Sequence, residues 1–123
     1  GARFERAALA DPSQDLDALQ RAVLSRYNGV DYPTDTPPTW ANTPFLATYP
    51  MYQQSYVLAA LVSSQVHAAL RARFGDRWYT PEGAAYVART LFAQGERVPW
   101  ERRIAESTGR PLDARDLLAR LAG

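Results

Sequence analysis

The sequence contains no cysteine and no lysine. Without cysteine, the chain has no disulfide, thiolate nucleophile, cysteine-based zinc site or iron–sulfur cluster. Its 14 basic residues are all arginine, and 13 Asp and Glu residues leave a net charge of +1. A nucleic-acid surface needs a clustered excess of positive charge, whereas here Arg alternates with Asp and Glu, as on solvated helix faces. We therefore expect no nucleic-acid partner.

Long apolar runs and strand-like alternation are also missing. No apolar run of about 18 residues occurs, so we expect no transmembrane helix, and the first residues do not have the pattern of a signal peptide. No stretch of five or more residues alternates strictly with β-branched side chains, so we expect no sheet. With 46% hydrophobic residues, a chain of this length can bury a core without disulfides.

The compartment and the context of the chain stay open at this point. Proteins of the bacterial cytoplasm and of the periplasm both tolerate the absence of cysteine. The chain begins at Gly1, already inside a helical pattern and without Met. This start fits a piece excised from a longer protein, and it equally fits a tag remnant.

Helix signals dominate what is present. Start signals such as Thr80 followed by Pro81, and stop signals such as Asn28-Gly29 and Gly109, punctuate the sequence. They predict an all-α fold of about five helices around one long, mostly buried central helix near residues 50–74. The predicted helix starts and stops are Pro12 to Asn28, Pro50 to Phe74, Thr80 to Gly95, Pro99 to Gly109, and a last helix from Asp113 with Asp116 as its capping partner.

One segment before the central helix has no periodicity. Residues 30–49 carry four prolines, and a connection of this length without structure is uncommon in a compact domain. We therefore expect one helical domain over residues 1–123, with N-terminal helices in 1–29, an irregular segment in 30–49 and a helical core in 50–123. The aromatic residues of the segment indicate packing against something: Tyr32, Trp40, Phe45 and Tyr49.

The central helix carries a polar stripe. At 100° per residue, Tyr52, Tyr56, Ser63 and His67 fall on one side of it. A Tyr at a helix start often packs its ring and gives its hydroxyl to a backbone carbonyl, so this stripe is by itself compatible with plain packing. His67 is the only His, and it lies roughly 16 Å along the axis from Tyr56. The residues alone reveal no zinc site, no acid–base pair and no Ser–His arrangement.

The order of the segments nevertheless resembles a known family. "FERAALADPSQDLDALQRAVLSRYNGV", "TWANTPF", "YPMYQQSYVLAALVSSQVHAAL" and "FGDRW", followed by the pattern "GxxxPWxxxxxxxTGxPL" over residues 95–112, are similar to the C-terminal end of zinc metallopeptidases. The families are the mostly helical oligopeptidases and the angiotensin-converting-enzyme type. The resemblance covers nearly the whole chain, but the zinc-binding HExxH motif of the family is not in it.

The resemblance implies a role in a peptide cleft. The zinc ligands of such a protein lie upstream, so zinc is expected in the parent protein and none is expected in this chain. The chain would form the wall opposite the zinc helix, with Tyr56 donating its hydroxyl to the oxyanion of the tetrahedral intermediate. Tyr52, Gln53 and Tyr49 would bind the peptide substrate. The implied partners are the upstream zinc-binding part and a peptide, and the chain alone should hydrolyse nothing.

One departure from the family leaves an alternative open. Relatives carry a His shortly before the Tyr-rich helix, and "WANTPF" places Phe45 there. Because Phe donates no hydrogen bond to a substrate, the parent protein is either a peptidase with rearranged contacts or a degenerate one. In the second case the chain would be a non-catalytic helical scaffold or a peptide-binding module. A third reading, a DNA-binding helix–turn–helix over "IAESTGRPLDARDLLARL", conflicts with the balanced charge.

Overall fold

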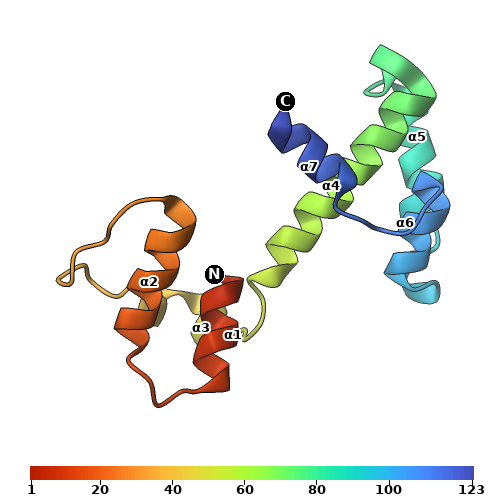
Figure 1. Cartoon of the computed structure of the whole chain (residues 1–123). Coiled ribbons are helices and arrows are strands. Elements are labelled where there is room, and N and C mark those ends of the chain that lie inside the picture. The colour runs from red at the N-terminus through yellow and green to blue at the C-terminus, as the bar shows by residue number, and fades with distance from the viewer. The chain divides into compact units, whose positions relative to one another are not determined.

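The computed structural model describes residues 1–123, except for the side chain of Ala47. The described residues form seven α-helices and no strand (Figure 1). The all-α class and the long central helix are therefore confirmed. The helices are α1 (Ala2–Ala10), α2 (Leu16–Asn28), α3 (Pro44–Ala47), α4 (Gln54–Phe74), α5 (Pro81–Val87), α6 (Trp100–Thr108) and α7 (Arg115–Ala122), joined by the 3-10 turns η1 (Trp40–Asn42), η2 (Gly75–Arg77) and η4 (Gly95–Arg97) and the π-helical turn η3 (Ala88–Phe92).

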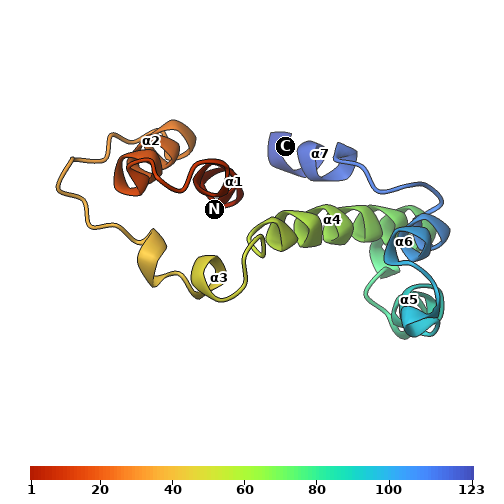
Figure 2. The ribbon, with the colours of Figure 1, turned by 90° about the horizontal axis from the view of Figure 1, so that it is seen from below.

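The chain divides into two compact units, Gly1–Val57 and Leu58–Gly123. The boundary falls inside α4, which is one continuous helix (Figure 2). The single domain expected over residues 1–123 stays a prediction. None of the described helices has the length and apolarity needed to cross a membrane.

The first unit is built around Phe4 on α1. Phe4 is buried, and its ring lies 6.3 Å from that of Trp40. The indole N–H of Trp40 donates to Asp17 Oδ1 on α2 at 2.7 Å. Gln20 and Thr39 exchange two further hydrogen bonds, of 2.6 and 3.0 Å. The irregular segment is thus fixed to α2 by side chains, which hydrophobic periodicity does not reveal.

The start of α4 differs from the sequence-based expectation. The helix begins at Gln54 and not near Pro50, because Tyr49 to Gln53 form a turn. Met51 in this turn has a φ of 63°, a left-handed conformation that a non-glycine residue rarely adopts. The Met51 N–H donates to Glu5 Oε1 on α1. This bond holds the turn in place.

The second unit packs α5, η3 and α6 together. Ile104 on α6 and Leu70 on α4 are buried, and Tyr86 on α5 meets Phe74 edge-on at 5.8 Å. A β carbon added at Gly83 would lie 2.0 Å from the Trp78 carbonyl oxygen. Only glycine fits this close approach between α5 and the preceding turn.

The expected burial of α4 needs correction. Its buried residues are Ser64, Gln65 and Leu70, whereas Tyr56 and Val57 are 54% and 55% exposed. The buried residues of α4 all lie in its second half, where Gln65, His67 and Phe74 contact other elements of the second unit. The apolar side chains in the first turns of α4 therefore did not indicate burial, because exposed apolar residues are common on protein surfaces.

A buried glutamine organises the second unit. Gln65 is 1% exposed, and its Nε2 donates to Thr108 Oγ1 at 2.7 Å and to the carbonyl oxygens of Arg110 and Pro111. Its Oε1 accepts from Arg110 Nη1 and from the Asp113 N–H, both at 3.1 Å. Four of these five hydrogen bonds join Gln65 to the "TGRPL" stretch, and the fifth joins it to Asp113.

Asp113 gives this region a pH-dependent stability. Two hydrogen bonds hold the pKa of the Asp113 carboxyl below its ordinary value of 3.8. The larger effect comes from the Arg115 N–H, and the smaller from the Arg110 guanidinium. A lowered folded-state pKa contributes stability above the unfolded pKa, and this contribution is lost as the pH falls through the folded pKa. We expect the unfolding free energy to fall below about pH 4, and to fall less steeply in Asp113→Asn. Denaturant unfolding at a series of pH values measures both slopes, and parallel curves would contradict the assignment.

Candidate functional site

Four aromatic side chains gather between α3 and the start of α4. This aromatic cluster consists of Phe45, Tyr49, Tyr52 and Tyr56. Phe45 stacks on Tyr52 with ring centroids 4.9 Å apart and an interplanar angle of 11°. Tyr49 lies 6.2 Å from Tyr52 at 52°. The turn at residues 49–53 brings these rings together across α3 and α4.

Tyr56 is held at the edge of the cluster. Its ring meets Phe45 at 5.8 Å and 70°, and Tyr52 at 5.8 Å and 77°. Such edge-to-face contacts contribute about 0.5–1.5 kcal/mol each beyond area burial. These two ring contacts limit the positions that the Tyr56 ring can take.

The hydroxyl groups of the cluster are available to a ligand. Tyr49, Tyr52 and Tyr56 are 57%, 44% and 54% exposed. Among the described residues, none forms a hydrogen bond with these three hydroxyls. An exposed phenol hydroxyl without a protein partner can donate a hydrogen bond to a ligand.

Gln53 does not join the cluster. A β carbon added at Gly1 would lie 2.6 Å from Gln53 Oε1, so the Gln53 side chain lies against the start of α1. It lines a separate small pocket with Trp40 and Gln20. The structure therefore brings together three of the four residues predicted for the site and separates Gln53 from them.

Phe45 has a role that the sequence did not reveal. By resemblance it occupies the place of an expected His, and we interpreted it as a lost hydrogen-bond donor. In the structure it is the ring on which Tyr52 stacks and against which Tyr56 packs. Phe45 is thus an apolar platform for the two Tyr rings, and the phenol hydroxyls are the hydrogen-bond donors of the cluster.

The described residues provide no metal centre. They contain no group of three His, Asp or Glu side chains placed to hold an ion. His67 is part-buried in the second unit, where its ring meets Trp78 edge-on at 4.5 Å. Outside the cluster, hydrogen bonds lower the pKa of the Asp11 and Glu82 carboxyls, from Ser13 and Thr80 respectively. These are local turn and cap contacts.

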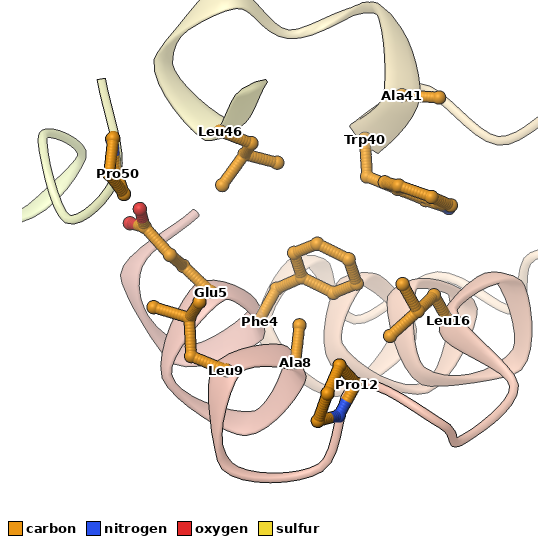
Figure 3. A pocket seen from close by; sticks show the side chains of 10 residues that line it. All are labelled: Phe4, Glu5, Ala8, Leu9, Pro12, Leu16, Trp40, Ala41, Leu46 and Pro50. Atoms are coloured by element: carbon orange, nitrogen blue, oxygen red, sulfur yellow. The ribbon is translucent and has the colours of Figure 1, made fainter. Parts of the chain in front are cut away.

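A pocket of about 300 Å³ in the first unit is a further candidate that sequence reasoning missed (Figure 3). It lies between α1 on one side and Trp40 and Leu46 on the other. Glu5 is in its wall, and Glu5 is buried. The sequence gives no signal of this pocket, because an acidic residue between Phe4 and Arg6 is an ordinary pattern on a helix.

The chain matches no family model, no curated protein and no solved structure. The metallopeptidase resemblance therefore rests on the sequence stretches alone.

Chemically, the cluster can bind and polarise but cannot activate a nucleophile. Phenol hydroxyls donate hydrogen bonds to carbonyl oxygens or oxyanions, and the rings offer faces to apolar side chains. The cluster itself contains no carboxylate, imidazole or amine that could act as a base. Side chains of this kind can contact a carbonyl-bearing ligand and donate hydrogen bonds to negative charge on it.

Proposed function

We propose that this chain is the C-terminal helical part of a zinc-dependent peptidase of the oligopeptidase or peptidyl-dipeptidase kind. In this proposal the aromatic cluster faces the peptide, and Tyr56 donates to the oxygen that becomes negative when the peptide carbonyl is attacked. The observation that carries it is the exposed Tyr56 hydroxyl, without a partner among the described residues, on a ring held by Phe45 and Tyr52. The sequence resemblance supports the same assignment.

The roles of the neighbouring residues follow from their positions. Tyr52 and Tyr49 place two further hydroxyls and ring faces beside Tyr56, where they can bind the peptide backbone and its apolar side chains. A preorganised donor aimed at a developing oxyanion contributes about 3 kcal/mol to transition-state stabilisation. Gln53 is not part of this arrangement, because its side chain lies against Gly1.

Zinc does not fit the residues present. The described residues hold no set of zinc ligands, so the metal and its ligands belong, in this proposal, to an upstream part of the same protein. What this chain supplies is a binding surface and one directed hydroxyl.

The proposal is tested on the full-length protein that contains this chain. We expect elemental analysis after dialysis to find about one zinc per chain, as in a catalytic site with three protein ligands. We also expect hydrolysis of short peptides that a chelator abolishes and that added zinc restores. The chain of residues 1–123 alone is the control and should hydrolyse nothing.

A second candidate function is favoured by Phe45. An apolar ring in the place of the expected His gives the cluster the character of a peptide-binding platform, and the chain would then be a non-catalytic binding or scaffold module. A folded full-length protein that takes up no zinc when zinc is in excess, and that hydrolyses no peptide, would contradict the peptidase proposal. Peptide binding that persists in that protein and weakens in Tyr52→Ala would support this second function.

A further inference from the structure

The pocket beside Glu5 has apolar walls and a single acidic group. Phe4, Glu5 and Ala8 on α1 face Trp40 and Leu46 across it (Figure 3). Its volume of about 300 Å³ is at the lower end of the range for small-molecule sites. Leu9, Pro12, Leu16, Ala41 and Pro50 complete the lining.

Glu5 is the unusual member of this wall. Its side chain is 3% exposed, and its carboxyl group lies beside Pro50 (Figure 3). Oε1 accepts the Met51 N–H, but the buried Oε2 has no hydrogen-bond partner among the described residues. Buried polar side-chain atoms nearly always have a partner. An unpartnered carboxylate oxygen in the wall of a pocket therefore indicates a missing donor.

The neighbouring residues do not provide that donor. Arg3 and Arg6 on the same helix are exposed, and no ion pair of the described residues involves Glu5. The indole N–H of Trp40 is already bound to Asp17, so Trp40 offers the pocket its apolar ring. A water molecule needs two to four polar partners to be stable in a cavity, and walls of this composition offer few.

We propose that this pocket binds a small hydrophobic amine, with a primary ammonium group on an aromatic or branched apolar body. The ammonium donates a charge-assisted hydrogen bond to Glu5 Oε2 and neutralises the buried carboxylate. The apolar body packs against Phe4, Leu16 and the face of Trp40. Charge complementarity selects an amine over an alcohol or a carboxylic acid of the same shape. This site uses no residue of the aromatic cluster and does not depend on the proposed peptidase function.

The binding test compares three ligands with one shape. 2-Phenylethylamine, 2-phenylethanol and phenylacetate are titrated into the chain by calorimetry, with the Trp40 indole N–H followed by NMR. We expect the amine to bind with a dissociation constant of about 1 mM or lower, within the per-atom limit for a ligand of its size, and to shift the Trp40 signal. The alcohol should bind at least about tenfold more weakly, and the acid should not bind. Equal binding of amine and alcohol, or no binding of the amine, would overturn the proposal.

Two variants locate the site. Glu5→Gln keeps an oxygen to accept the Met51 N–H but removes the charge. It should therefore weaken binding of the amine by at least tenfold, or about 1.4 kcal/mol, and leave binding of the alcohol unchanged. Ala8→Leu fills the pocket from α1 and should abolish binding of both, whereas Ala10→Leu, at an exposed position of the same helix, should leave it intact. Far-UV circular dichroism verifies that each variant is folded. Unchanged amine binding in Glu5→Gln, or in Ala8→Leu, would place the amine elsewhere and refute the assignment.

Discussion

Replacing Tyr56 by Phe in the full-length protein should lower kcat for peptide hydrolysis by roughly a hundredfold and change KM little. The substitution removes one hydroxyl and keeps the ring that packs against Phe45 and Tyr52. A donor directed at an oxyanion interacts more strongly with the transition state than with the bound peptide, so its loss appears in kcat. Losing one such donor typically costs two to three orders of magnitude, or about 3–4 kcal/mol. Steady-state kinetics on a chromogenic peptide measure both constants.

Two further variants make this result specific. Tyr27→Phe removes a hydroxyl of similar exposure from α2, outside the cluster, and should leave kcat and KM unchanged. Tyr52→Phe removes a hydroxyl beside Tyr56 that we assign to peptide binding, so it should raise KM more than it lowers kcat. If Tyr56→Phe behaves like Tyr27→Phe in an active peptidase, the oxyanion role of Tyr56 is wrong even though the cleft assignment stands.

Much of the helical architecture could be predicted from the sequence, because helix starts and ends depend on the chemistry of a few neighbouring residues. Gly29 and Gly109 end α2 and α6 in the left-handed conformation that glycine adopts most readily. Pro81 begins α5 after Thr80, as its fixed φ favours. Where the sequence offers more than one helix-start signal, the observed boundary differs from the predicted one. The helix expected to begin at Pro12 begins at Leu16, because the Asp15 side chain accepts the Ala18 N–H.

Three features of the fold could not be predicted in this way. The left-handed Met51 depends on Glu5, which is far away in the sequence. The helix expected up to Gly95 leaves α5 at Val87 and continues as the π-helical turn η3, although Thr90 and its neighbours form an ordinary helical pattern. The division at Val57 lies within a continuous helix. Each of these three features depends on tertiary contacts, which the hydrophobic periodicity of the sequence does not reveal.

In the candidate site, too, some features follow from the local sequence and others depend on the tertiary fold. Tyr52 and Tyr56 are four residues apart, a spacing that predicts their proximity in a helix, but Tyr52 lies in the turn before α4 and contacts Tyr56 from there. Tyr49 and Phe45 join them only because the turn at residues 49–53 folds back toward α3. Gln53 lies next to Tyr52 in sequence, but its side chain leaves in another direction, toward Gly1. The resemblance placed Gln53 in a cleft without this knowledge of the turn.

Replacing Gln65 by Leu should lower the unfolding free energy of the second unit by about 2–3 kcal/mol. Leu has a similar size and would add the favourable burial of an aliphatic side chain, which is about 1.5–3 kcal/mol. The change also removes all five hydrogen bonds of the Gln65 amide, to groups in residues 108–113. Each partner left unsatisfied in a buried place costs about 1–3 kcal/mol. The Thr108 hydroxyl and the carbonyl and guanidinium of Arg110 keep other hydrogen bonds. The Pro111 carbonyl and the Asp113 N–H lose theirs, and the cost of these two groups exceeds the apolar gain.

Denaturant unfolding followed by the fluorescence of Trp78 and Trp100, with hydrogen exchange of the Asp113 amide, measures this effect in the second unit. Gln54→Leu makes the same substitution at an exposed position of α4 and should stay within about 0.5 kcal/mol of the wild type. Combining Gln65→Leu with Thr108→Val should cost about 1 kcal/mol less than the sum of the two single changes, because both remove the same 2.7 Å bond. A Gln65→Leu protein as stable as the wild type, with the Asp113 amide still protected, would mean that residues 108–113 are held by packing and not by the buried amide.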